Sequence, residues 1–145
     1  MIGGEIYALV VALIWGISPL IEKMALKYIE PITAVFIIIT LNFLIISLYY
    51  FFSGELSMDN LLNIPPIAIL YLFIVSLLAG VLAQYLFYNA LKLSSPSKVV
   101  IISSMYPFIT ILVSTIIYGK LPSYKLIVGA IFIFIGLYIV VGESV

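Results

Sequence analysis

The chain has no cysteine and no histidine among its 145 residues, and all of its basic residues are lysines. Without cysteine it has no disulfides, no thiolate metal sites and no lipid anchors on sulfur. It also has no paired carboxylates within one apolar run, no glycine-rich phosphate loop and no cluster of metal ligands. We therefore expect that the protein is not an enzyme and that it holds neither a cofactor nor a metal.

Charge is scarce as well. Charged residues make up 8% of the chain and the formal net charge is zero, whereas 66% of residues are hydrophobic and the mean hydropathy is +1.38. A neutral chain has no basic patch for nucleic acid, and we expect no nucleic-acid partner. The apolar fraction lies far outside the range of soluble domains and indicates a protein that resides in the lipid bilayer.

Five uncharged runs are long enough to span a bilayer, which requires about 20 apolar residues. They cover Ile6–Ile21, Pro31–Phe52, Pro66–Leu91, Val99–Gly119 and Leu126–Val141. The runs are continuously apolar, so they predict helices and not the alternating strands of a membrane barrel. The expected fold is all-α: a polytopic membrane protein with five transmembrane helices in one domain, residues 1–145.

The linkers between these runs are short and contain residues that start helices. Prolines lie at or near the predicted helix starts, where a missing N–H costs nothing. Ser97 is the expected N-cap of the fourth helix and Ser123 that of the fifth. The first run lacks a basic leader and a cleavage site, and we interpret it as a retained helix and not a signal peptide.

An odd number of spans places the two chain ends on opposite sides of the membrane. The linkers on one side carry Lys23, Lys27, Lys92 and Lys98, and those on the other carry Lys120 and Lys125. The positive-inside rule then favours the N-terminus outside and the C-terminus inside. Counting the N-terminal amine as well reduces the excess of positive charge on the first side. Insertion in both orientations is therefore a second hypothesis.

Several motifs occur in an order and spacing typical of one transporter family. The first span carries ALIWGISPLIEKMALKY and the second opens with PITAVF. The third linker and fourth span read YNALKLSSPSKVVIISSMYPFITIL, and the chain closes with IIYGKLPSYKLIVGAIFIFIGLYIVV. In these motifs the chain resembles the EamA domain of the drug/metabolite transporter superfamily over nearly its whole length.

The resemblance implies a transporter whose helices surround a central cavity. Most relatives carry two such domains as an inverted repeat, and this chain carries one. Relatives usually have an arginine early in the second span, where this chain offers Thr40 and Asn42. They often have Gly-Glu after the fourth span, where this chain has Gly119 and Lys120. Without a buried arginine, a carboxylate or phosphate substrate is less favoured.

Polar side chains in the middle of spans are the best indicators of a solute pathway, because lipid penalises them unless they face the bundle. These residues are Asn42, Gln84, Ser103, Ser104 and Thr110, with Trp15 and Tyr106 as aromatic neighbours. Gln84 and Tyr88 are one helical turn apart and predict a shared polar face. Alternatively, Asn42 and Gln84 only join neighbouring helices by hydrogen bonds.

Proline and glycine add two further hypotheses. Pro107 lies well inside the fourth span and frees the carbonyl of Ser103, and Pro19 acts similarly in the first span. A freed carbonyl beside a cavity can bind a ligand, and the interrupted helix can bend there, although a kink without a functional contact is the alternative.

Gly129 and Gly136 allow close helix contact, either in ordinary packing or in a dimer interface.

The predicted positions of the acidic residues argue against a transport mechanism that is coupled to protons. Glu5 and Glu22 flank the first span at the expected depth of the lipid headgroups, and no acidic residue is predicted at mid-membrane. Coupling through either residue is a minor hypothesis.

The sequence thus predicts a multi-pass plasma-membrane transporter of a small metabolite or drug-like solute, with the bilayer, the solute and a second copy as partners. The homodimer is expected to be antiparallel and to imitate the inverted repeat. A non-transporting membrane subunit is the alternative, and a channel is disfavoured because no continuous polar stripe is present. The predicted substrate-binding residues are Trp15, Asn42, Gln84, Tyr88, Ser103, Tyr106 and Pro107.

Overall fold

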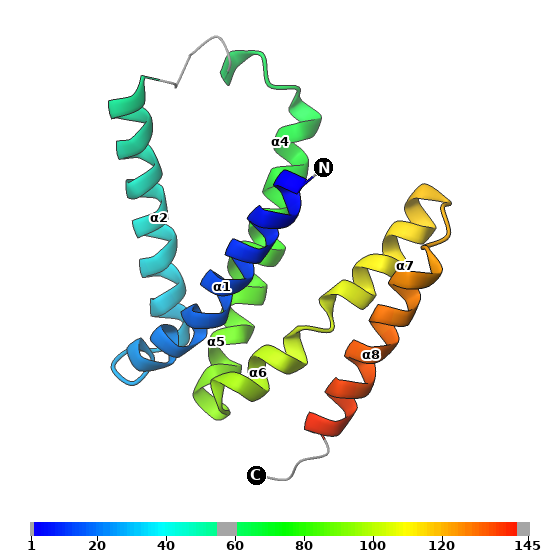
Figure 1. Ribbon diagram of the computed structural model, residues 1–145. Coiled ribbons are helices and arrows are strands. Elements are labelled where there is room, and N and C mark those ends of the chain that lie inside the picture. Colours follow the sequence, from blue (N-terminus) through cyan, green and yellow to red (C-terminus); the bar gives the residue numbers. More distant parts are fainter. Residues whose placement is uncertain (1, 55–60, 142–145) are drawn as a thin grey trace. The chain divides into compact units, whose positions relative to one another are not determined.

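A computed structural model describes the backbone of residues 2–54 and 61–141 and the side chains of residues 4–54 and 61–139. Within these ranges the chain consists of helices and the turns between them, with no strand (Figure 1). The predicted all-α membrane fold is therefore confirmed.

The helices follow the five apolar runs. The first two are α1 (Ile2–Ala25) and α2 (Pro31–Ser53). The third run is one continuous stretch made of α4 (Pro66–Val75), the π-helical segment η1 (Ser76–Ala83) and α5 (Gln84–Leu93). The fourth run comprises α6 (Pro96–Ser103) and α7 (Tyr106–Tyr118), and the fifth is α8 (Tyr124–Val141).

Length and apolarity agree with membrane crossing. Within the described residues, four helical stretches are long and apolar enough to span a bilayer: Gly4–Ala25, Pro31–Ser53, Pro66–Leu93 and Pro96–Tyr118. The fifth helix, α8, is also apolar and has 18 residues, close to the lower limit for a span. The chain is a multi-pass membrane protein.

Local chemistry sets the helix ends. Gly54 ends α2 in the left-handed region at φ 66°, a conformation that costs glycine little, and its N–H donates to the carbonyl of Tyr50. Ser95 caps α6 by accepting a hydrogen bond from the N–H of Lys98, so the predicted cap at Ser97 is wrong. Pro96 occupies the first helical position, which moves the cap to the residue before it. The predicted cap at Ser123 is confirmed, since its hydroxyl accepts from the N–H of Leu126 at 3.3 Å.

The chain divides into two compact units. One contains Met1–Leu20 with Ser94–Val145, and the other is Ile21–Leu93. Helix α1 contributes to both, because the division falls between Leu20 and Ile21, just after Pro19. Helix α1 continues through Pro19 without ending. A single domain over residues 1–145 stays a prediction.

The unit Ile21–Leu93 is packed around the start of α2 and the end of α5, which contact each other. Its buried apolar side chains are Leu26, Pro31, Ala34, Val35, Tyr88 and Leu91. Ala34 is small and lets the two helices approach closely, which is how helices associate in lipid. Tyr88 and Leu91 are 2% and 0% exposed, so this face of α5 is closely packed within the unit.

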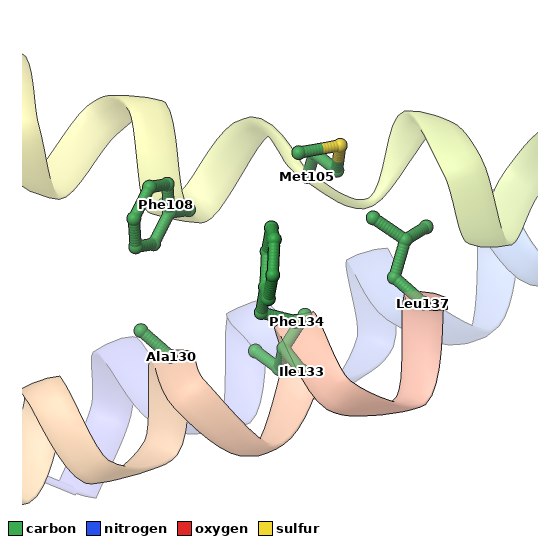
Figure 2. Close-up of a pocket in the computed structure, with 6 residues that line it drawn as sticks. All are labelled: Met105, Phe108, Ala130, Ile133, Phe134 and Leu137. Carbon is green, nitrogen blue, oxygen red and sulfur yellow. The ribbon is translucent and has the colours of Figure 1, made fainter. Parts of the chain in front are cut away.

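In the other unit α8 packs alongside α6 and α7. Ala130 and Leu137, two turns apart on α8, are buried there. Figure 2 shows a small apolar pocket in this unit, lined by Met105, Phe108, Ala130, Ile133, Phe134 and Leu137. The rings of Phe108 and Phe134 meet with centroids 6.1 Å apart.

Gly129 and Gly136 lie on an exposed part of α8. A Cβ atom added at either glycine would meet nothing within 4 Å. Among the described residues, therefore, no helix of this chain makes the close contact that these glycines permit. The dimer-interface hypothesis stays open for them.

Candidate solute-binding site

A carboxylate on α1 meets two polar side chains of α5 inside the unit Ile21–Leu93. The phenol of Tyr88 donates to Oε1 of Glu22 at 3.2 Å, and the amide Nε2 of Gln84 donates to the same oxygen at 3.5 Å. We call these three side chains the Glu22 cluster. All of them lie within helical stretches long and apolar enough to span the membrane. A carboxylate at such a position needs hydrogen-bond donors, and this cluster supplies two.

Packing holds the two donors in place. Gln84 and Tyr88 are one turn apart, and Leu91 follows on the same face of α5. Because Tyr88 and Leu91 are buried, the ring of Tyr88 has little freedom and its hydroxyl has a fixed direction. Gln84 is the first residue of α5, directly after the π-helical segment η1. A π-helical turn changes the rotational phase of the residues beyond it, and such turns are frequent at functional sites.

Two lysines form contacts at the end of α5. The ammonium of Lys23 donates to the carbonyls of Leu91 and Lys92 at the end of α5. A cation at that place satisfies carbonyls that the helix leaves unpaired and complements the helix dipole. Lys92 in turn forms an ion pair with Glu30 at 2.8 Å, immediately before α2. These contacts join α1, α2 and α5 next to the Glu22 cluster.

The interruption expected at Pro107 is present in the other unit. Helix α6 ends at Ser103 and α7 begins at Tyr106, with Pro107 in its first turn. The N–H groups of Ser104 and Met105 donate to the carbonyls of Val100 and Ile102. Proline has no N–H to donate to the carbonyl of Ser103, which is the group that the sequence predicted to be freed.

The predicted site residues therefore fall into three groups. Gln84 and Tyr88 meet, as their spacing predicted. Trp15 and Tyr106, which are 62% and 57% exposed, belong to the other unit together with Ser103 and Pro107, and a lining shared with Gln84 stays a prediction for them. Asn42 is exposed in the middle of α2 and makes no side-chain hydrogen bond with the described residues.

The hydroxyls expected near a pathway are mostly bound to their own helices. Ser103 and Ser104 both donate to the carbonyl of Val100, at 3.0 and 2.7 Å. Thr110 donates to the carbonyl of Tyr106 at 2.9 Å. Such local bonds satisfy a hydroxyl in lipid without a partner from another helix.

The sequence did not name Glu22 as a site residue. Helix α1 continues to Ala25, so Glu22 lies about one turn before its end, and the predicted depth of Glu22 at the level of the headgroups stays a prediction. The polar face formed by Gln84 and Tyr88 was the available signal, because an amide and a phenol in lipid together require an acceptor.

These features define an α-helical multi-pass membrane protein with a polar site between two of its helices. The sequence profile of the EamA-like transporter family matches residues 2–142, and the chain belongs to this family. The resemblance to the EamA domain of the drug/metabolite transporter superfamily is thereby confirmed. No curated protein and no solved structure matches the chain.

The contact between Glu22 and Tyr88 has a measurable energy. In a double-mutant cycle of Glu22→Leu and Tyr88→Phe, we expect a coupling free energy of about 1 to 2 kcal/mol in detergent unfolding, because each change removes the hydrogen bond between the two side chains. The control cycle combines Glu22→Leu with Tyr138→Phe, at an exposed position of α8. Equal coupling in both cycles would contradict the contact.

Proposed function

We propose that the protein transports a small metabolite or drug-like solute across the plasma membrane, and that it works as a homodimer. The Glu22 cluster carries this proposal. A carboxylate, an amide and a phenol meet within spans that otherwise consist almost entirely of apolar side chains. Polar groups at such positions typically mark the paths of ions and substrates.

Membership of the EamA-like transporter family supports transport over the alternative, a non-transporting subunit that uses the same side chains only to pack against a larger partner. The two functions differ in one observable property, since only a transporter moves solute through a sealed vesicle. The proposed activity requires no chemical conversion of the solute, and we do not assign an enzymatic reaction.

Transport is tested with proteoliposomes loaded with an extract of small cellular metabolites. We expect at least one solute to leave faster than from protein-free liposomes, as measured by mass spectrometry. Gln84→Ala should slow this release about tenfold or more, because it removes a donor to a charged group. Tyr138→Ala, at a position 76% exposed on α8, should change it less than about twofold.

Both variants must elute like the native protein in size-exclusion chromatography. If no solute leaves faster than from protein-free liposomes, the transporter proposal fails and the subunit hypothesis takes its place.

The dimer is supported by two features of the single chain. The resemblance implies a cavity built from two EamA domains, and residues 2–142 match the family model. Asn42 is exposed at the middle of α2, and its amide finds no side-chain partner in the described residues. In lipid, an amide at that depth gains most from a hydrogen bond to another helix, and a second copy supplies one.

This role of Asn42 predicts an effect on association. Asn42→Leu should weaken dimerisation in liposomes about three- to thirtyfold, as measured by fluorescence transfer on dilution into lipid. The matched control is Thr40→Val on the same helix, because the hydroxyl of Thr40 donates to the carbonyl of Phe36 at 2.8 Å and is already satisfied. Dimerisation unchanged by Asn42→Leu would exclude Asn42 from the interface.

The odd number of predicted spans supports an antiparallel arrangement of the two copies. Duplication of a five-helix domain produces halves of opposite orientation, and a single domain reaches the same arrangement only if copies insert both ways. The nearly balanced lysines of the two sides permit this.

Dual insertion is tested with single cysteines at Ser97 and Leu121. Both positions are exposed, they lie at opposite ends of the stretch Pro96–Tyr118, and the native chain has no cysteine. In intact cells, a membrane-impermeant maleimide should label each site in about half of the molecules. Complete labelling of one site with none of the other would show a single orientation.

A further inference from the structure

The break between α6 and α7 leaves a backbone acceptor without a donor. In a continuous helix the N–H of Phe108 would donate to the carbonyl of Ser104, four residues earlier. It donates instead to the carbonyl of Met105, at 3.0 Å. No described residue donates to the carbonyl of Ser104. The preceding carbonyl, that of Ser103, has also lost its helical donor, because Pro107 has no N–H.

The depth of the break makes this acceptor unusual. Eight residues of α6 lie on one side of it and 13 residues of α7 on the other, within a stretch long and apolar enough to span the membrane. Acyl chains have no hydrogen-bond donor, so irregular backbone at this depth occurs where it meets protein or a polar cavity. Ser104 is only partly buried, and its carbonyl therefore needs a donor from outside the described chain.

Nearby hydroxyls do not meet this need. The hydroxyls of Ser103 and Ser104 both donate to the carbonyl of Val100. The hydroxyl of Thr110 donates to the carbonyl of Tyr106. The polar side chains around the break are thus already bound to their own helices, and the carbonyl of Ser104 stays available.

The surroundings of the break are apolar and uncharged. Met105, in the turn that forms the break, also lines the small apolar pocket with Phe108 and Phe134 (Figure 2). No acidic residue occurs between residues 94 and 142, so a cation bound here would have no counter-charge within this segment. A carboxylate or phosphate group brings acceptors and not donors. The break therefore suits an uncharged donor that is attached to an apolar group.

We propose that the break between α6 and α7 binds the transported solute, an uncharged amphiphile whose hydroxyl or amide N–H donates to the carbonyl of Ser104. Its apolar part lies against the side chains of Met105 and Phe108. This inference rests on the proposed transport function and names its substrate class. A solute with a donor replaces the missing helical hydrogen bond, whereas a solute without one leaves the carbonyl unpaired.

Binding is tested apart from transport, with the protein in nanodiscs of uncharged lipid. The probes are 2-phenylethanol and its methyl ether, which share a ring and differ in the hydroxyl donor. The carbonyl resonance of Ser104 is observed in protein labelled with ¹³C at serine carbonyls and ¹⁵N at methionine, and it is assigned by its loss in Met105→Leu. We expect the alcohol to shift this resonance saturably and to bind at least about threefold more tightly than the ether.

The variant Pro107→Ala supplies the missing N–H and lets α6 and α7 join, so that Phe108 donates to the carbonyl of Ser104. Its Ser104 resonance should differ from that of the native protein without any probe, and the alcohol should no longer move it. Pro19→Ala is the matched control, because it replaces a proline in α1, a helix that continues through Pro19. This control should preserve the preference for the alcohol.

The comparison of the two probes in the native protein decides the inference by itself. A Ser104 resonance that the alcohol does not move would overturn it, and would indicate that water or a second copy occupies the carbonyl. An equal shift with the ether would also overturn it. Release of a solute that leaves this resonance unmoved would contradict the inference and leave the transport function intact. If the alcohol binds at Ser104 but no solute is released, the donor site stands and the transport function fails.

Discussion

The account depends on how a carboxylate is accommodated within membrane-spanning helices. A partly buried carboxylate among apolar side chains needs hydrogen-bond donors, and in this chain the phenol of Tyr88 and the amide of Gln84 provide them. Both donors bind the same carboxylate oxygen, so the cluster holds the side chain of Glu22 in place between α1 and α5.

The surrounding unit keeps this arrangement in position. Tyr88 and Leu91 are buried where α5 contacts the start of α2, while Lys23 binds the carbonyls at the end of α5. Movement of α5 would therefore disturb its packing and the cluster together. The ion pair of Lys92 with Glu30 adds less, because Glu30 is 74% exposed and exposed pairs contribute about 1 kcal/mol or less.

The sequence allowed most of the fold to be predicted, because continuous apolar runs have no other stable form in lipid. The pairing of Gln84 with Tyr88 also followed from helical periodicity. The contact of both side chains with Glu22 did not follow, because helical periodicity relates residues of one helix and does not show which acceptor a neighbouring helix supplies. The segment η1 was not predicted either, because its sequence, SLLAGVLA, is almost uniformly apolar and has no polar face in which a change of rotational phase could be seen. At Ser97, the cap prediction overlooked that Pro96 itself fits the first helical position.

The central claim is that Glu22 meets the solute during transport. Its most direct test is the carboxyl carbon resonance of Glu22 in protein labelled with ¹³C-glutamate and reconstituted in lipid, assigned by its loss in Glu22→Gln. Adding the solute found in the release assay should shift this resonance, saturating at the concentrations that saturate transport, while the resonance of Glu5 stays unchanged. A Glu22 resonance that does not move while transport saturates would contradict the account.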